Sequence, residues 1–168
     1  YRIPHEEMPL VYDVAHNVAK FEEHRVNGST VTLCVHRKGA TRAFGPGAAD
    51  LPAEYSRTGQ PVIIPGSMGT PSYILHGTQT AMERSFGSTC HGAGRVESRT
   101  AAKKQRKGSE VRRDLEKRGI LVRAPNDASI AEEAPEVYKP SSEVVRVVHE
   151  ANLSLLVARL EPLAVIKG

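Results

Sequence analysis

Glycine and proline divide this chain into short segments, and that division restricts the folds open to it. The sequence holds 14 glycine and 11 proline residues among 168. Short apolar runs between turn residues suit short strands and helices rather than long helical bundles. Helical and extended patterns follow one another in no regular order, so we expect an α+β fold rather than a doubly wound sheet. The length suits one domain or part of a larger one.

The clearest local prediction is a hairpin that turns at Asn27-Gly28. Asn-Gly supplies the two positive φ angles of a type I′ turn, and Val31, Leu33 and Val35 alternate along the second strand. A residue stretch at 9–23 reads as a short helix or a strand. Further strands are predicted at 61–65, 73–76, 120–123 and in the apolar run 153–166. Helices are predicted up to residue 105, over 110–118 with Ser109 as the N-cap, and over 142–152.

Composition excludes several classes of protein. No apolar run approaches the roughly 18 residues of a membrane span, and no secretory signal pattern opens the chain. The first residue is Tyr1, so we expect a processed chain or a fragment. Two cysteines without zinc-ligand spacing favour a reducing cytoplasm over a disulfide scaffold or a structural zinc site.

Positive charge is concentrated in one stretch. Residues 95–118 carry ten basic and four acidic side chains, whereas residues 1–94 are balanced at eight of each. This distribution is typical of a surface that binds a polyanion. The alternative is a solvated helix face with ordinary salt pairs.

Three glycine-containing loops are candidates for binding phosphate, at 36–42, 65–70 and 87–95. Glycine lets backbone amides approach phosphate oxygens, although none of the three has the spacing of a P-loop. His91 lies inside the last loop among small residues, where it can act as a nucleophile, base or ligand, or be an ordinary surface histidine. His16 has small, apolar neighbours that predict a buried or half-buried ring, either a core residue or a ligand. Cys34 and Cys90 are expected to pack.

Several segments together resemble the RtcB-type RNA-splicing ligases. They are DVAHN at 13–17, HRKGATRAF at 36–44, PGSMGTPSY at 65–73, FGSTCHGAGR at 86–95, AEEAPEVYK at 131–139 and the final Lys167-Gly168. The resemblance runs in order from residue 1 to residue 168 but covers only the C-terminal third of such a ligase. It implies that residues 1–168 are the guanylate-binding, nucleophile-bearing segment of a larger ligase domain.

The resemblance also implies a reaction. Ligases of this family join an RNA 2′,3′-cyclic phosphate or 3′-phosphate end to a 5′-hydroxyl, using GTP and two manganese ions. A histidine accepts GMP, passes it to the RNA 3′-phosphate, and the 5′-hydroxyl then displaces it. Their usual substrates are tRNA halves, and a small protein called archease can assist.

Residue by residue, His91 matches the guanylylated histidine and His16 a manganese ligand. Lys38, Arg95 and Arg99 resemble RNA-phosphate contacts. The guanylate contacts implied by the resemblance are His16, Asn17, Pro65, Gly66, Ser67, Met68, Ser72, His91, Gly92, Ala93, Gly94, Tyr138 and Lys167.

The family's other manganese ligands, an Asp, a bridging Cys and two His, precede the matched region and have no counterpart here. Neither Cys34 nor Cys90 matches the bridging Cys. We therefore expect this chain to be inactive alone and to need the missing upstream part as its partner. Two other functions stay open from the residues themselves: a non-catalytic RNA-binding module that uses residues 95–118, and a metal-dependent phosphohydrolase that uses His16 and His91.

Overall fold

A computed structural model describes residues 4–167; residues 1–3, Gly168 and the side chains of His5 and Arg99 lie outside the description. The α-helices within that range are α1 Gln79–Ser85, α2 Arg99–Gln105, α3 Gly108–Lys117, α4 Asp127–Glu132 and α5 Ser141–Glu150. The strands are β1 Asn17–Val26, β2 Ser29–Lys38, β3 Ala40–Arg42, β4 Pro61–Ile64, β5 Ser72–Gly77, β6 Ser88–Cys90, β7 Leu121–Arg123, β8 Ser154–Leu160 and β9 Ala164–Ile166. Short 3-10 helices are η1 His5–Glu7, η2 Ala53–Tyr55 and η3 Pro135–Val137.

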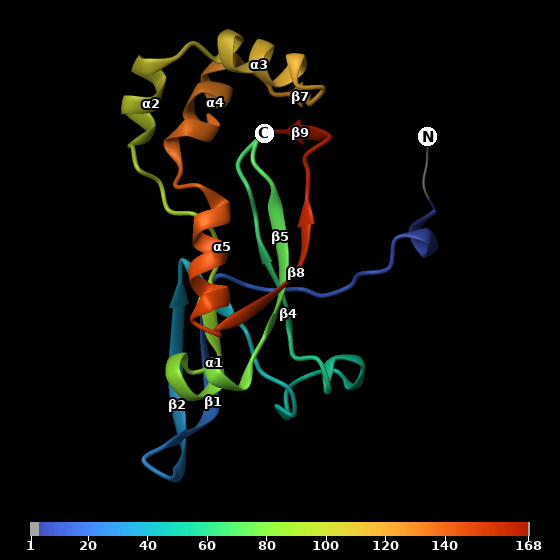
Figure 1. The fold of residues 1–168 in the computed structure, drawn as a ribbon, viewed down its shortest axis with the longest axis vertical. Coiled ribbons are helices and arrows are strands. Elements are labelled where there is room, and N and C mark those ends of the chain that lie inside the picture. The colour runs from blue at the N-terminus through green and yellow to red at the C-terminus, as the bar shows by residue number, and fades with distance from the viewer. Residues whose placement is uncertain (1–3, 168) are drawn as a thin grey trace.

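The elements form several small sheets with helices packed beside them, which confirms the α+β prediction. In Figure 1 the β1–β2 hairpin lies at one end of the molecule and helices α2, α3 and α4 gather at the other. Between them, α5 lies along one side of the β4–β5–β8 sheet. Within residues 4–167, no helix has the length and apolar run that a membrane crossing requires.

The hairpin forms as its turn sequence predicts. Asn27 and Gly28 have φ angles of 50° and 84°, as a type I′ turn requires. Strand pairing begins next to the turn, at Val26 opposite Ser29, and continues to Asn17 opposite Lys38. The predicted helix or strand at 9–23 is therefore a strand only from Asn17 onward, and the segment before it is largely extended chain.

The central sheet buries one face against α5. Antiparallel β4 and β5 place Val62, Ile64 and Leu75 on the same side, where they pack with Val145 and Val148 of α5. Both strands lie where the apolar runs predict them, and α5 begins one residue before the predicted helix and ends two residues before its predicted end. This core supports the loops at both ends of β4 and β5.

A second core lies at the helical end. Val111 and Leu115 of α3 pack against Val122 of β7 and Ile130 of α4. The predicted Ser109 cap is wrong: α3 begins at Gly108, with Lys107 in the cap position and no side-chain cap hydrogen bond. Helices α1 and α4 were not predicted, because short segments with few apolar residues carry little periodic signal.

The apolar run 153–166 does not form one strand. Strand β8 pairs with β5, and after Pro162 the chain returns as β9, which pairs in parallel with β7. Val165 packs against the helical core, whereas Leu163 and Ile166 are more than four-fifths exposed. The C-terminal tail is therefore held by strand pairing and one side chain rather than by burial of the whole run.

A buried ion pair joins the hairpin to the rest of the fold. Arg37 donates to both carboxylate oxygens of Glu22 at 2.7 and 2.8 Å, and the two side chains are 1% and 2% exposed. His24 lies 3.0 Å from the same carboxylate. Arg37 also donates to the carbonyl of Phe86 and to Ser88, both at 2.9 Å, in the turn that leads into β6. A cation that satisfies acceptors on two segments fixes those segments relative to each other.

We predict that Glu22→Ala lowers the free energy of unfolding by about 3–5 kcal/mol, because it leaves the Arg37 guanidinium buried without its counter-charge. Urea denaturation measures the loss. The matched control is Glu23→Ala at the next position, where the side chain is exposed and the change should stay within about 0.5 kcal/mol.

The same pair sets a pH dependence. Burial alone would raise the pKa of Glu22, but hydrogen bonds and charges from Arg37 and His24 outweigh it and lower the pKa below 4.5. The carboxylate therefore contributes stability above about pH 4.5, and that contribution is lost as the pH falls through the folded-state pKa. The stability difference between wild type and Glu22→Ala should shrink on acidification; a constant difference would contradict this account.

Candidate functional site

Two histidines stack against each other where β6 ends. The rings of His16 and His91 have centroids 3.8 Å apart and planes within 3° of parallel. His16 is exposed, so the prediction that it is buried or half-buried is wrong, while His91 is partly covered. The two side chains come from positions 75 residues apart, which makes their contact a product of the fold.

Backbone pairing explains the contact. Strand β3 pairs with β6, and beyond the pair Ala40–Cys90 the amide of His91 donates to the carbonyl of Gly39 at 3.3 Å. On the other side, the Thr41 hydroxyl of β3 donates to the carbonyl of Ala15 at 3.2 Å, next to His16. Strand β3 thus holds both histidine-bearing segments.

The setting favours a neutral imidazole at His91. Burial, and then the neighbouring His16, lower its pKa below the usual value. Neutral imidazole is the nucleophilic form.

The two cysteines differ in their surroundings. Cys90, next to His91, packs against the central core, as predicted. Burial raises the pKa of the Cys90 thiol, which makes this thiol a poor nucleophile. Cys34, by contrast, is exposed on the hairpin, so its predicted packing is wrong.

His91 lines a cavity of about 470 Å³. Its wall brings together most of the residues that the sequence singled out: Pro65, Gly66, Ser67, His91, Gly92, Ala93, Gly94, Arg95, Tyr138 and Lys167. A Cβ built on Gly92 or Gly94 would meet nothing within 4 Å, so both glycines leave room in front of the backbone. A polar cavity with open glycine backbone beside a histidine suits an anionic ligand.

Hydrogen bonds stabilise the loop 65–70. Ser67 and Thr70 bond to each other through the amide of Ser67 and the hydroxyl of Thr70, at 2.8 Å. The Ser72 hydroxyl accepts from the amide of Gly66 at 3.0 Å. A Cβ on Gly66 would lie 2.2 Å from the carbonyl oxygen of Thr70, so this position requires glycine. Ser72 therefore supports the loop from behind and does not line the cavity.

The opposite wall is a charged cluster. The Tyr138 hydroxyl donates to Glu133 at 2.6 Å, and Arg95 donates to the Tyr138 hydroxyl at 2.8 Å while its guanidinium lies over the tyrosine ring. Lys167 Nζ lies 3.6 Å from the same Glu133 carboxylate. Burial, and then the hydrogen bond to Glu133, raise the pKa of Tyr138, so its hydroxyl stays protonated. Arg95, predicted to contact RNA phosphate, has its guanidinium engaged within this wall.

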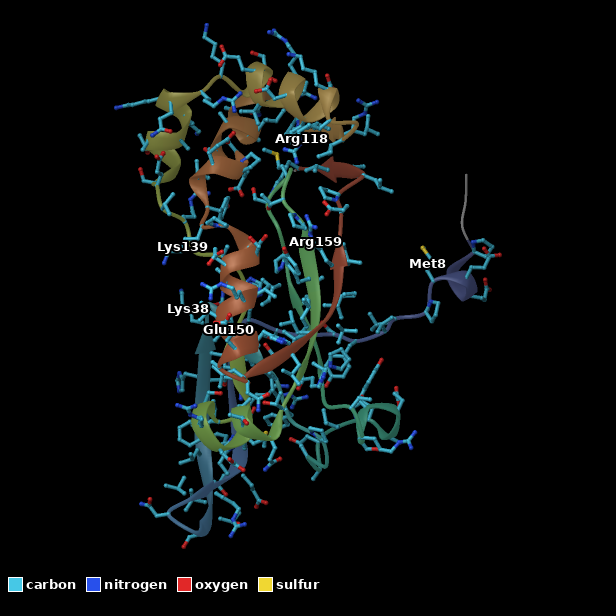
Figure 2. All side chains as sticks on the ribbon, viewed as in Figure 1. Met8, Lys38, Arg118, Lys139, Glu150 and Arg159 are labelled. Atoms are coloured by element: carbon cyan, nitrogen blue, oxygen red, sulfur yellow. The ribbon has the colours of Figure 1, made fainter. Side chains whose placement is uncertain are left out.

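Other predicted residues lie outside the cavity wall. Met68 is buried in the helical core, and Asn17 is exposed at the start of β1. Lys38 pairs with Asn17 at the open end of the hairpin; Figure 2 shows it on the same side of the molecule as Lys139, which lines the cavity. The side chain of Arg99 lies outside the described residues, so its predicted RNA contact stays a prediction.

The sequence reasoning missed some residues of the wall. They are Gly39, Thr70, Glu133, Lys139 and Ser141. Gly39 and Thr70 lie within the glycine-containing loops 36–42 and 65–70 that the sequence analysis identified, but neither was named there as a site residue. Glu133 lies in a segment recognised only by resemblance, and no local spacing distinguishes it from other acidic residues.

The basic stretch is partly neutralised by the fold. Lys103 pairs with Glu132, Arg106 with Asp114, and Arg112 with Asp127. The remaining exposed cations of α2, α3 and their junction have no ion pair among the residues that the structure describes. They are Lys104, Lys107, Arg113 and Lys117, which we call the α2–α3 basic surface. Part of the stretch therefore forms ordinary salt pairs, and binding of a polyanion by the remaining cations stays a prediction.

A manganese site is not complete in this chain. Within the described residues, no group of three or more His, Cys, Asp or Glu side chains has the arrangement that could hold a metal ion. His16 provides an exposed imidazole, but one ligand does not hold a divalent transition metal. Among the described residues, His16 is therefore not part of a complete metal site.

Comparison with known proteins defines the class. Open glycine loops beside a histidine, together with a basic surface, are features that suit a phosphate-bearing ligand. A family model described as tRNA-splicing ligase RtcB matches residues 2–168. The chain belongs to the RtcB tRNA-splicing ligase family.

Individual relatives agree. The chain is 66% identical over 161 residues to the tRNA-splicing ligase RtcB of Archaeoglobus fulgidus, and 56% identical over 162 residues to that of Methanococcus maripaludis. These matches cover 96% of this chain but 33% and 34% of the relatives. Against the Pyrococcus horikoshii protein, 58% identity covers 18% of the relative's length. The chain thus spans about a third, or less, of the relatives it matches.

We predict that Gly92→Ala leaves stability unchanged within about 0.5 kcal/mol, because the added methyl enters open space. Gly66→Ala, the contrasting variant, should lose about 1–3 kcal/mol through its clash with the loop backbone. Thermal and urea unfolding measure both. Equal losses of stability in the two variants would contradict the difference in free space around Gly92 and Gly66.

Proposed function

We propose that this chain is the nucleotide-binding segment of a GTP- and manganese-dependent RNA ligase, in which His91 accepts GMP. The complete enzyme joins RNA 2′,3′-cyclic phosphate or 3′-phosphate ends to 5′-hydroxyl ends. Family membership supports the reaction class. The observation that carries the assignment of His91 is its place in the lining of the glycine-lined cavity, which Lys167 also lines.

Water first opens a 2′,3′-cyclic phosphate end by breaking the bond between phosphorus and O2′, which leaves a 3′-phosphate and a 2′-hydroxyl. From the 3′-phosphate the proposed chemistry has three balanced steps. An imidazole nitrogen of His91 attacks the α-phosphorus of GTP; a phosphorus–nitrogen bond forms, and the bond to the β-phosphate oxygen breaks to release pyrophosphate. An oxygen of the RNA 3′-phosphate then attacks the same phosphorus, and the imidazole leaves. Finally the RNA 5′-hydroxyl attacks the activated RNA phosphate, loses its proton and displaces GMP.

The residues of the cavity suit the first step. Gly92 and Gly94 leave space beside the nucleophile, and the loop 65–70 is rigid enough to hold a ligand in one position. Lys167 and Lys139 add positive charge to the wall, which favours a guanine nucleotide carrying phosphates. Two manganese ions would activate the phosphates in the complete enzyme. Since the family resemblance assigns a single residue of this chain, His16, to the manganese ions, we propose that the chain is inactive alone.

Several large apolar side chains of the described chain are exposed. Ile63 of β4 is 44% exposed, and Val157 of β8, Leu163 and Ile166 near the C-terminus are between 62% and 84% exposed. Exposed apolar side chains of this kind are available to pack against a further part of the protein. We propose that the remaining two thirds of the ligase cover them. We also propose tRNA halves as the substrate, archease as an assisting protein and a cytoplasmic location.

The first prediction concerns the nucleophile. In the complete ligase supplied with manganese and labelled GTP, His91→Ala should abolish the covalent guanylate, since the buried Cys90 thiol cannot replace the imidazole. The adduct should be lost in mild acid and survive base, as a phosphoramidate does. Gel autoradiography and peptide mass spectrometry measure both properties.

His36→Ala is the matched control, because His36 is exposed on the hairpin and lies outside the cavity wall. It should be labelled like the wild type. A guanylate found on another residue, or label of equal strength in His91→Ala, would contradict the assignment.

The second prediction concerns RNA. Replacing all four cations of the α2–α3 basic surface by alanine should reduce the slope of log affinity against log salt by about 3, because each phosphate contact contributes about 0.7–0.9. Guanylylation of His91 should not change. Fluorescence anisotropy with a labelled RNA at several salt concentrations gives the slope.

Arg25→Ala and Arg84→Ala serve as the control, since both are exposed cations on β1 and α1, which lie toward the other end of the molecule from α2 and α3 (Figure 1). They should leave the slope unchanged. If the fourfold variant keeps the wild-type slope, the RNA path lies elsewhere on the molecule.

A further inference from the structure

One acidic residue, Glu133, contacts four other residues that line the cavity. The Glu133 backbone carbonyl accepts from the Ser67 hydroxyl at 2.8 Å, which ties it to the loop 65–70. Its carboxylate accepts from the Tyr138 hydroxyl at 2.6 Å and lies 3.4 Å from Arg95 and 3.6 Å from Lys167. The four partners come from four different parts of the sequence.

The charges in this cluster explain why the position is acidic. Arg95 and Lys167 bring two positive charges to one wall, and their side chains are only 23% and 32% exposed. Without a carboxylate between them, the two cations would repel each other in a partly buried site. Glu133 offsets the repulsion and gives each donor a common acceptor.

Lys167 depends on this acceptor more than the others do. Its backbone amide donates to the carbonyl of Arg123 at 2.8 Å, which holds the main chain of the tail. The long side chain has four rotatable bonds, and Glu133 is the partner that the structure records for its ammonium. Chain ends are where order is weakest, so a charged partner at this point reduces the freedom of the side chain.

We propose that Glu133 is a positioning residue for nucleotide binding: it holds the Tyr138 hydroxyl and the Lys167 ammonium in the cavity wall before the nucleotide arrives. The inference rests on the proposed function. It acts on ground-state binding, because neither Tyr138 nor Lys167 is the reacting group. Loss of such an interaction raises KM and leaves kcat nearly unchanged.

The test is guanylylation of His91 in the complete ligase at varied GTP concentration. Glu133→Gln should raise KM for GTP by about tenfold to a hundredfold, with kcat within about twofold of wild type. Glu133→Asp keeps the charge and should show a smaller rise. Glu136→Gln is the matched control, since Glu136 pairs with Arg106 outside the cavity and should leave KM unchanged.

A double-mutant cycle with Lys167→Met separates positioning from a general structural effect. If Glu133 acts through Lys167, Glu133→Gln should raise KM much less when Lys167 is already replaced. Thermal unfolding of each variant checks the fold, and Glu133→Asp carries the cycle if Glu133→Gln does not fold.

Additive effects in the cycle, a KM like that of wild type, or a fall in kcat at unchanged KM would each overturn the inference while leaving the proposed function intact. Wild-type protein that forms no guanylate on His91 would overturn both. Guanylylation of His91 in the wild-type protein distinguishes these two outcomes by itself.

Discussion

The arrangement of the site depends on one buried cation. Arg37 lies on β2 and satisfies acceptors on β1, through Glu22, and in the turn before β6, through Phe86 and Ser88. His16 immediately precedes β1 and His91 immediately follows β6. The guanidinium therefore fixes the relative position of the two strands that carry the histidines. A planar guanidinium with several donors can bond to acceptors on both strands at the same time, which a lysine ammonium cannot do in the same geometry.

The cavity in front of His91 depends on a second charged residue in a comparable way. Glu133 is bonded to the loop 65–70 through its backbone and to Tyr138 through its carboxylate. In both places a charged side chain joins segments that are distant in the sequence. The Glu22 side chain is almost fully buried, whereas the Glu133 side chain is partly exposed. Removing either charge leaves its partners unsatisfied, so each costs more than an exposed ion pair does.

The distribution of charge on the helical end shows how folding modifies a sequence pattern. Residues 95–118 have a clear excess of basic side chains, yet Lys103, Arg106 and Arg112 each find a carboxylate after folding. Two of those three carboxylates, Glu132 and Asp127, lie outside the stretch. A count of charge along the sequence therefore overstates the cation density presented to a polyanion, because acidic residues from α4 approach the same surface.

The sequence by itself determined the local features of this protein. Asn27-Gly28 requires positive φ angles and so produces the hairpin, the apolar runs produce β4, β5 and α5, and the glycines around His91 indicate a loop open to a ligand. The tertiary structure decided which of these features meet. That His16 stacks on His91, that Met68 turns into the core, and that Glu133 joins Tyr138 and Lys167 all depend on strand pairing and packing between distant segments. Contacts of that kind leave no periodic signal in the sequence, because hydrophobic burial and backbone pairing fix them only once the whole chain has folded.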